Sequence, residues 1–124
     1  MSARAKYLGA AGTVVLGQIR DLAEQRSLNY PVFSYGVGSC APNKLAKVVA
    51  VNEPVHLGVR QIYPGDIMVA DENGVVVVPQ PLIDRVLAYI PHRVEADTLA
   101  AQDIKEGVPA KTAQTNRRKN LPEF

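Results

Sequence analysis

The chain has 124 residues, of which 47% are apolar and 21% charged, an ordinary balance for a globular domain. Its length predicts one domain, residues 1–124, and its net charge of only +2 argues against a nucleic-acid partner held by bulk charge. The chain has a single cysteine, which excludes an internal disulfide, so we expect a cytoplasmic protein. No apolar run reaches the length of about 20 residues that spans a bilayer, so we expect no membrane partner.

The first third of the chain predicts helix, strand, helix and strand in turn. Residues 2–9 suit a helix, with Ala3, Ala5 and Leu8 as good helix formers and Gly9 as a possible stop. The apolar run 13–16 is typical of a buried strand. Residues 21–28 predict a short helix, because Pro31 forces extended backbone just beyond it. With a second strand at 32–36, this order indicates a β–α–β unit.

The middle of the chain predicts strands separated by turns. Four strand-like runs follow one another: residues 46–57, 59–62, 66–71 and 74–79. The clearest hairpin signal is Asn73-Gly74, and Asp66 and Asp71 are interpreted as turn residues. The unbroken valines of "GVVVV" predict a strand that is covered on both faces.

The last third predicts helices. Apolar residues at helical spacing are Leu82, Ile83, Val86, Leu87 and Ile90. We expect Pro91 to kink or split this helix and Gly107 to end it. Residues 108–124 form a polar tail, either a short helix or a loose arm, and its basic cluster 117–119 is interpreted as a solvated end.

Arg20, Asp21 and Glu24 stand where the first strand meets the following helix. In a structural interpretation, Asp21 and Glu24 form a capping box, in which each side chain accepts a hydrogen bond from a free backbone N–H of the helix start. Arg20 would then pair with Glu24 or another surface carboxylate, an interaction of little energetic weight. This interpretation assigns the three residues no chemistry.

A functional interpretation uses the same residues as an open site. A helix start favours an anion, and a guanidinium can hold a carboxylate through two parallel hydrogen bonds. Mg²⁺ takes one or two protein carboxylates and keeps several waters. Arg20 could therefore orient a 2-oxo acid while a metal on Asp21 polarises its carbonyl and stabilises the enolate formed when a carbon–carbon bond breaks.

Two stretches closely resemble the RraA-like family. They are "GTVVLGQIRDLAEQRSLNYPVFSYGVG", with the Arg-Asp-x-x-Glu motif, and "PGDIMVADENGVVVVP", with the Gly-Asp…Asp-x-x-Gly-Val-Val-Val-Val-Pro hairpin. A third stretch, "AAQDIKEG", is similar to the family's C-terminal helix. The resemblance covers nearly all of residues 3–107.

The resemblance implies an α/β fold of the swivelling β/β/α type, assembled into homotrimers or hexamers with active sites between subunits. The family contains class II 4-hydroxy-4-methyl-2-oxoglutarate aldolases, which also decarboxylate oxaloacetate, and the protein regulator of ribonuclease E. By this analogy Arg20 contacts the substrate carboxylate, Asp21 binds Mg²⁺ or Mn²⁺, and Glu24 contacts the metal through water.

We therefore expect a metal-dependent lyase that cleaves a carbon–carbon bond of a short 2-oxo acid. The alternatives are a non-catalytic, protein-binding regulator and a truncated relative recruited to another pathway. The family's substrate-binding loop glycine falls before Met1, so the resemblance implies the C-terminal portion of the domain. Leu16 and Tyr35 stand where many relatives have aspartate and arginine.

Overall fold

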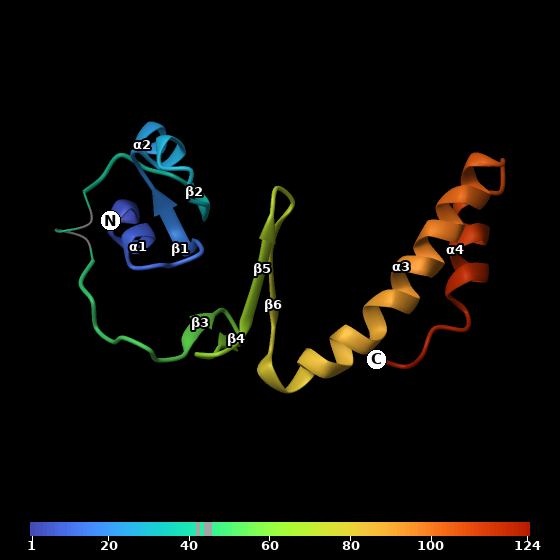
Figure 1. The fold of residues 1–124 in the computed structure, drawn as a ribbon. Coiled ribbons are helices and arrows are strands. Elements are labelled where there is room, and N and C mark those ends of the chain that lie inside the picture. Colours follow the sequence, from blue (N-terminus) through green and yellow to red (C-terminus); the bar gives the residue numbers. More distant parts are fainter. Residues whose placement is uncertain (42, 44–45) are drawn as a thin grey trace. The chain divides into compact units, whose positions relative to one another are not determined.

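The structure is a computed structural model that describes residues 1–41, 43 and 46–124. These residues fall into two compact units, Met1–Val77 (unit 1) and Val78–Phe124 (unit 2), and each is described by itself. Unit 1 holds the strands, except the last residue of β6, and unit 2 holds the long helices (Figure 1). The mixture of helices and strands confirms the α/β class.

Unit 1 begins with the predicted β–α–β arrangement, preceded by a short helix. Its elements are α1 (Ser2–Tyr7), β1 (Thr13–Ile19), α2 (Leu22–Ser27) and β2 (Val32–Val37). β1 and β2 pair in parallel, which requires a crossover connection, and α2 lies within it. β1 extends beyond the predicted run. Its pairing register with β2 shifts between Val15 and Gln18, the stretch that contains Gly17.

Tyr30 fastens the beginnings of these two strands together. It is only 6% exposed, and its hydroxyl lies 2.8 Å from the Thr13 hydroxyl. The backbone N–H of Thr13 also donates to the carbonyl of Pro31 at 3.0 Å. These contacts fix the amino ends of β1 and β2 side by side, so their carboxyl ends also meet at one edge.

The middle of the chain forms two pairs of short strands. They are β3 (Val55–Leu57), β4 (Arg60–Ile62), β5 (Ile67–Asp71) and β6 (Gly74–Val78). β3 pairs antiparallel with β4, and β5 pairs with β6. The strand expected over residues 46–57 was wrong for 46–54, which are irregular because no described strand pairs with them.

The turns that join these strands confirm the interpretation of Asp66 and Asp71 as turn residues. Asp66 accepts a hydrogen bond from the backbone N–H of Tyr63 at 2.8 Å. Asp71 accepts one from the backbone N–H of Asn73 at 2.7 Å, and this bond lowers the pKa of Asp71. Both carboxylates thus stabilise turns by local bonds of the kind that favours aspartate there.

The prediction that β6 is covered on both faces was wrong for this chain. Val76 is 65% exposed, and none of the five residues of β6 is buried. A run of valines without polar alternation is typical of a strand inside a sheet that has layers on both sides. Among the described residues β6 pairs with β5 alone, so no second strand of this part of the chain shields it.

Unit 2 is a pair of helices. After a short 3-10 turn, η2 (Gln80–Leu82), helix α3 (Ile83–Lys105) runs without a break, so Pro91 does not split it. Gly107 ends α3 as predicted: it has a φ of +96° and its N–H donates to the carbonyl of Ile104. Among the described residues, neither α3 nor a shorter helix combines the length and the apolar run that a membrane span needs.

The polar tail contains a short helix, α4 (Ala110–Arg118), which packs against α3 (Figure 1). The buried residues of this contact are Ala96, Ala100 and Ala113. Arg117 is not a free solvated end, since it makes two hydrogen bonds of 2.7 Å to Asp103. Arg118 pairs with Asp97 at 2.7 Å.

These ion pairs predict that acid weakens the packing of α4 on α3. Hydrogen bonds from arginines hold the pKa values of Asp97 and Asp103 below the ordinary 3.8. A carboxyl with a lowered pKa stabilises the folded state fully above its unfolded value, and this stabilisation is lost as the pH falls through the lowered pKa. We expect thermal unfolding, followed by circular dichroism, to show a drop in stability below about pH 4.

The control for this prediction is the double variant Asp97→Asn, Asp103→Asn, which has no carboxyl at either position. Its melting temperature at neutral pH should be lower than that of the wild type. Acidification should lower the melting temperature of the double variant by less than that of the wild type. Equal decreases in the two proteins would mean that other carboxyl groups cause the acid sensitivity.

Candidate functional site

Arg20 and Asp21 lie at the carboxyl end of the parallel strand pair. They join β1 to α2, directly after Ile19. The carbonyl of Ile19 accepts a hydrogen bond of 2.8 Å from the N–H of Gly38, the residue that follows β2. The ends of both strands therefore meet beside the pair, and ligands of open α/β sheets bind outside this edge.

Asp21 has an unusual backbone conformation for the residue that starts a helix. Its φ of 60° and ψ of 41° lie in the left-handed region, and its side chain makes no capping hydrogen bond. The capping-box interpretation was therefore wrong, because a capping residue needs extended backbone to aim its carboxylate at the helix N–H groups. Non-glycine residues in this region cluster at functional sites, and aspartate tolerates it better than most.

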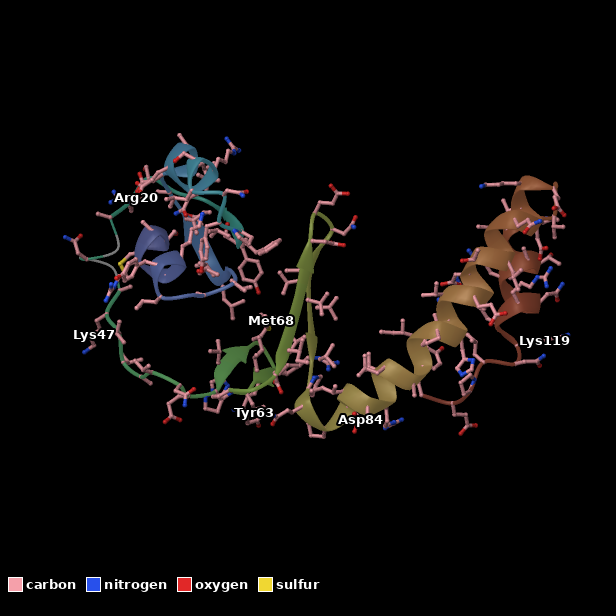
Figure 2. All side chains as sticks on the ribbon, viewed as in Figure 1. Arg20, Lys47, Tyr63, Met68, Asp84 and Lys119 are labelled. Atoms are coloured by element: carbon pink, nitrogen blue, oxygen red, sulfur yellow. The ribbon has the colours of Figure 1, made fainter. Side chains whose placement is uncertain are left out.

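Arg20 and Asp21 form an ion pair with each other. Nε of Arg20 lies 3.2 Å from Oδ2 of Asp21, and their side chains are 47% and 53% exposed. Figure 2 labels Arg20 at the surface of this part of unit 1. An exposed pair of this kind contributes at most about 1 kcal/mol to stability, so it can open to admit a ligand at little cost.

Glu24 lies on α2, three residues after Asp21, and its side chain is exposed. Its backbone carbonyl accepts hydrogen bonds from the hydroxyl of Ser27 and the N–H of Leu28. Within the described residues, its carboxylate makes no hydrogen bond or ion pair. Glu24 is thus available at this end of the strands, but it does not touch the pair.

One carboxylate beside an arginine fits a magnesium or manganese ion that keeps most of its water. The carboxylate of Asp21 pairs with Arg20 through Oδ2 and makes no ion pair with another cation of the described residues. No three His, Cys, Asp or Glu side chains of the described chain converge on one point, so a closed, all-protein metal site is not formed. Magnesium is commonly bound by one or two carboxylates together with water and substrate oxygens.

The hollows of unit 1 lie away from this pair. One of about 570 Å³ and another of about 550 Å³ share Val14, Leu16, Phe33, Ile62 and Met68 in their walls. Neither is lined by Arg20, Asp21 or Glu24. The sequence predicted the strands that form these hollows but not the hollows themselves, since strand alternation does not show which faces stay uncovered.

Comparison with known proteins places the chain in one family. A profile of the RraA-like family, described as Aldolase/RraA, matches residues 1–77. A protein of Halalkalibacterium halodurans named "Putative 4-hydroxy-4-methyl-2-oxoglutarate aldolase" is 36% identical over 106 residues, which make up 86% of this chain and 50% of that protein. A protein of the same name from Shewanella oneidensis is 31% identical over 74 residues, 60% of this chain and 44% of that protein.

A solved structure supports the same relationship. An uncharacterized protein from Pseudomonas syringae pv. tomato is 30% identical and superposes with a TM-score of 0.75, over 92% of this chain and 57% of that one. The chain therefore spans about half the length of each of these three relatives. The family profile covers more than half of the chain and includes β1, α2 and β2 with Arg20, Asp21 and Glu24. The chain belongs to the RraA-like family.

Proposed function

We propose that this chain carries the core of a metal-dependent carbon–carbon lyase site for short 2-oxo acids. The observation that carries the proposal is the exposed Arg20–Asp21 pair at the carboxyl end of two parallel strands. The names of two relatives also support the proposal, because both are called putative aldolases of 4-hydroxy-4-methyl-2-oxoglutarate, which is a 2-oxo acid. Oxaloacetate decarboxylation belongs to the proposal because it passes through the same kind of enolate.

Arg20 is the substrate-orienting residue of this proposal. Its Nε pairs with Asp21 at 3.2 Å, and its guanidinium makes no other ion pair with the described residues. A guanidinium can hold a carboxylate by two parallel hydrogen bonds. The substrate carboxylate would thereby be held next to Asp21, with the neighbouring carbonyl towards the aspartate.

Asp21 holds the divalent cation, Mg²⁺ or Mn²⁺, in this proposal. Its backbone is left-handed and its side chain makes no capping hydrogen bond, so Arg20 is the one ionic partner of its carboxylate in the described chain. Glu24 assists from α2 by accepting a hydrogen bond at the rim of the site. When bound, the cation supplies Lewis-acid polarisation of the substrate carbonyl.

The exposure of the Arg20 and Asp21 side chains is the reason why the proposal includes assembly of several subunits. Both side chains are about half exposed, and the hollows of unit 1 do not include them. An adjacent subunit of a homotrimer or hexamer, built from swivelling β/β/α domains, would exclude water from the pair. Exclusion of water strengthens the charge interactions on which enolate formation depends.

A second candidate is a non-catalytic, protein-binding regulator. The observation that favours it is the separation of Arg20 and Asp21 from the apolar hollows, which leaves them on an open surface. Such a surface can bind a partner protein without turnover. The two candidates differ in one measurable property, the release of pyruvate.

The test is pyruvate release from oxaloacetate by the purified chain with Mg²⁺ or Mn²⁺. A coupled lactate dehydrogenase assay should show release above that of the metal alone, and EDTA should abolish the excess. The same assay with 4-hydroxy-4-methyl-2-oxoglutarate checks the aldol cleavage. A folded chain that never exceeds the metal-only rate would contradict the lyase proposal and favour the regulator.

Arg20→Lys is expected to raise the KM for oxaloacetate by about tenfold, with a smaller change in kcat. A lysine keeps the charge but loses the planar fork that binds a carboxylate by two bonds, and one charged hydrogen bond is worth about 1.5–3 kcal/mol. The matched control is Arg93→Lys, in a half-buried ion pair with Asp97 on α3. An unchanged KM in Arg20→Lys would remove Arg20 from substrate binding.

A further inference from the structure

Gln18 lies close to the Arg20–Asp21 pair, and the lyase proposal gives it no role. It is the last residue but one of β1, and its side chain is exposed. A Cβ added to Gly38 would lie 2.7 Å from Oε1 of Gln18, so the carboxamide is folded over the backbone of Gly38. The N–H of Gly38 donates to the carbonyl of Ile19, the residue before Arg20. The carboxamide of Gln18 is therefore at the same edge of the strand pair as Arg20 and Asp21.

Gln18 and Arg20 also belong to the same face of the strand pair. Side chains two residues apart along a strand project to one face, and Arg20 directly follows the last residue of β1. The exposure of alternate residues agrees, since Gln18 and Arg20 are exposed whereas Gly17 and Ile19 are half-buried. Two such positions are about 6.6 Å apart along a strand, a distance that a four-carbon chain bridges when each of its ends is hydrogen-bonded.

The carboxamide of Gln18 has its hydrogen-bonding capacity to spare. It makes no hydrogen bond to the part of the chain that the structure describes. A carboxamide has two N–H donors and an oxygen that accepts, so it can bind an ether, carbonyl or hydroxyl oxygen. Its position over Gly38 depends on the missing side chain at residue 38, because any Cβ there would collide with it.

The neighbouring strand leaves space beside Gln18. Gly36 is the residue of β2 that pairs with Gln18. A Cβ added to Gly36 would meet nothing within 4 Å, and the φ of Gly36 is not positive. Neither the backbone conformation nor the packing of the described residues therefore requires glycine at position 36. A strand glycine of this kind often marks a place where a ligand approaches the backbone closely.

We propose that Gln18 determines specificity by donating a hydrogen bond to an oxygen atom on C4 of the 2-oxo acid, while Gly36 leaves room for the C4 substituent. This inference rests on the proposed function, because Arg20 and Asp21 must fix the 2-oxo acid end of the ligand. The site then prefers 2-oxo acids with an oxygen on C4 to acids of the same shape with a methylene group there.

The test compares two acids that a lyase of this kind does not cleave, because neither has a hydroxyl on C4. They are 4-methoxy-2-oxobutanoate and 2-oxohexanoate, which differ only in an ether oxygen in place of a methylene group. Nuclear magnetic resonance titrations of the unaltered chain with Mg²⁺ should show that the methoxy acid binds about fivefold more tightly, the gain expected from one hydrogen bond. The side-chain N–H signals of Gln18 should shift with the methoxy acid and not with 2-oxohexanoate.

Two substitutions test the location. Gln18→Met keeps the length of the side chain but removes its donor, so the two acids should bind equally well. Gly36→Val fills the space beside Gln18 and should weaken the binding of both acids at least about tenfold. The matched control is Gln114→Met, at an exposed glutamine of α4, which should keep the fivefold preference. Circular dichroism of each variant checks that its secondary structure is intact.

Three results would overturn the proposal: equal affinities of the two acids for the unaltered chain, a preference that Gln18→Met retains, and titrations in which neither acid binds. The outcome is separable from that of the pyruvate assay. A chain that prefers the methoxy acid but releases no pyruvate would keep the role of Gln18 and exclude the lyase. A chain that releases pyruvate but shows no preference would keep the lyase and exclude the role of Gln18.

Discussion

Asp21→Asn is expected to lower metal-dependent pyruvate release by more than about 100-fold, since Lewis-acid stabilisation of a developing enolate is worth several kcal/mol. Asparagine is the informative replacement because it has nearly the same shape and also tolerates the left-handed backbone of Asp21. The variant should therefore fold normally and lose only the charge that holds the cation. The measurement is the initial rate with saturating Mg²⁺ or Mn²⁺.

The matched control is Asp97→Asn on α3, which removes the charge of another aspartate that is paired with arginine. It should leave the rate within about twofold of the wild type. Manganese titration by electron paramagnetic resonance adds a readout besides turnover, since Asp21→Asn should bind the ion more weakly. A variant that keeps both the rate and the ion affinity would exclude Asp21 as the metal ligand.

Ala100→Leu is expected to destabilise the contact of α3 with α4 by about 1–3 kcal/mol, the usual cost of overpacking a filled interface. Ala100 is 2% exposed, and together with Ala96 and Ala113 it makes up the buried part of unit 2. A larger side chain would force the helices apart and stretch the Arg117–Asp103 and Arg118–Asp97 pairs. Faster hydrogen exchange in α4 should report the change.

The neighbouring substitution Ala101→Leu is the matched control, because Ala101 lies on the same helix and is exposed. Both variants gain the same side chain with the same helix propensity. If packing against α4 decides the outcome, only Ala100→Leu should lower the melting temperature. Equal effects at both positions would show that the alanine contact does not hold α4 in place.

The sequence alone determined the local structure of this protein well. The β–α–β unit followed from two apolar runs on either side of a short helical segment, and its parallel pairing is observed. Gly107 ends α3, and Asp66 and Asp71 stabilise turns, as their residue types predict. These features depend on bonds between residues a few positions apart, which sequence patterns describe directly.

The candidate site was only partly predictable. Its residues and their place after β1 followed from the sequence, and the family to which the motif pointed is confirmed. The left-handed backbone conformation of Asp21 could not be predicted from the sequence, because an Asp-x-x-Glu pattern fits a capping box equally well. The left-handed conformation, which a cap does not use, becomes visible only once the ends of β1 and α2 are placed.

The tertiary structure alone decided which surfaces are covered. The valines of β6 predict burial on both faces, but burial needs other elements to pack there, and in the residues that the structure describes β6 pairs only with β5. Likewise, Arg117 reaches Asp103 and Arg118 reaches Asp97 only because α4 folds back on α3. The spacing of apolar residues along a segment determines which of its faces can pack against other elements. Which faces are in fact buried depends on the long-range packing of the chain.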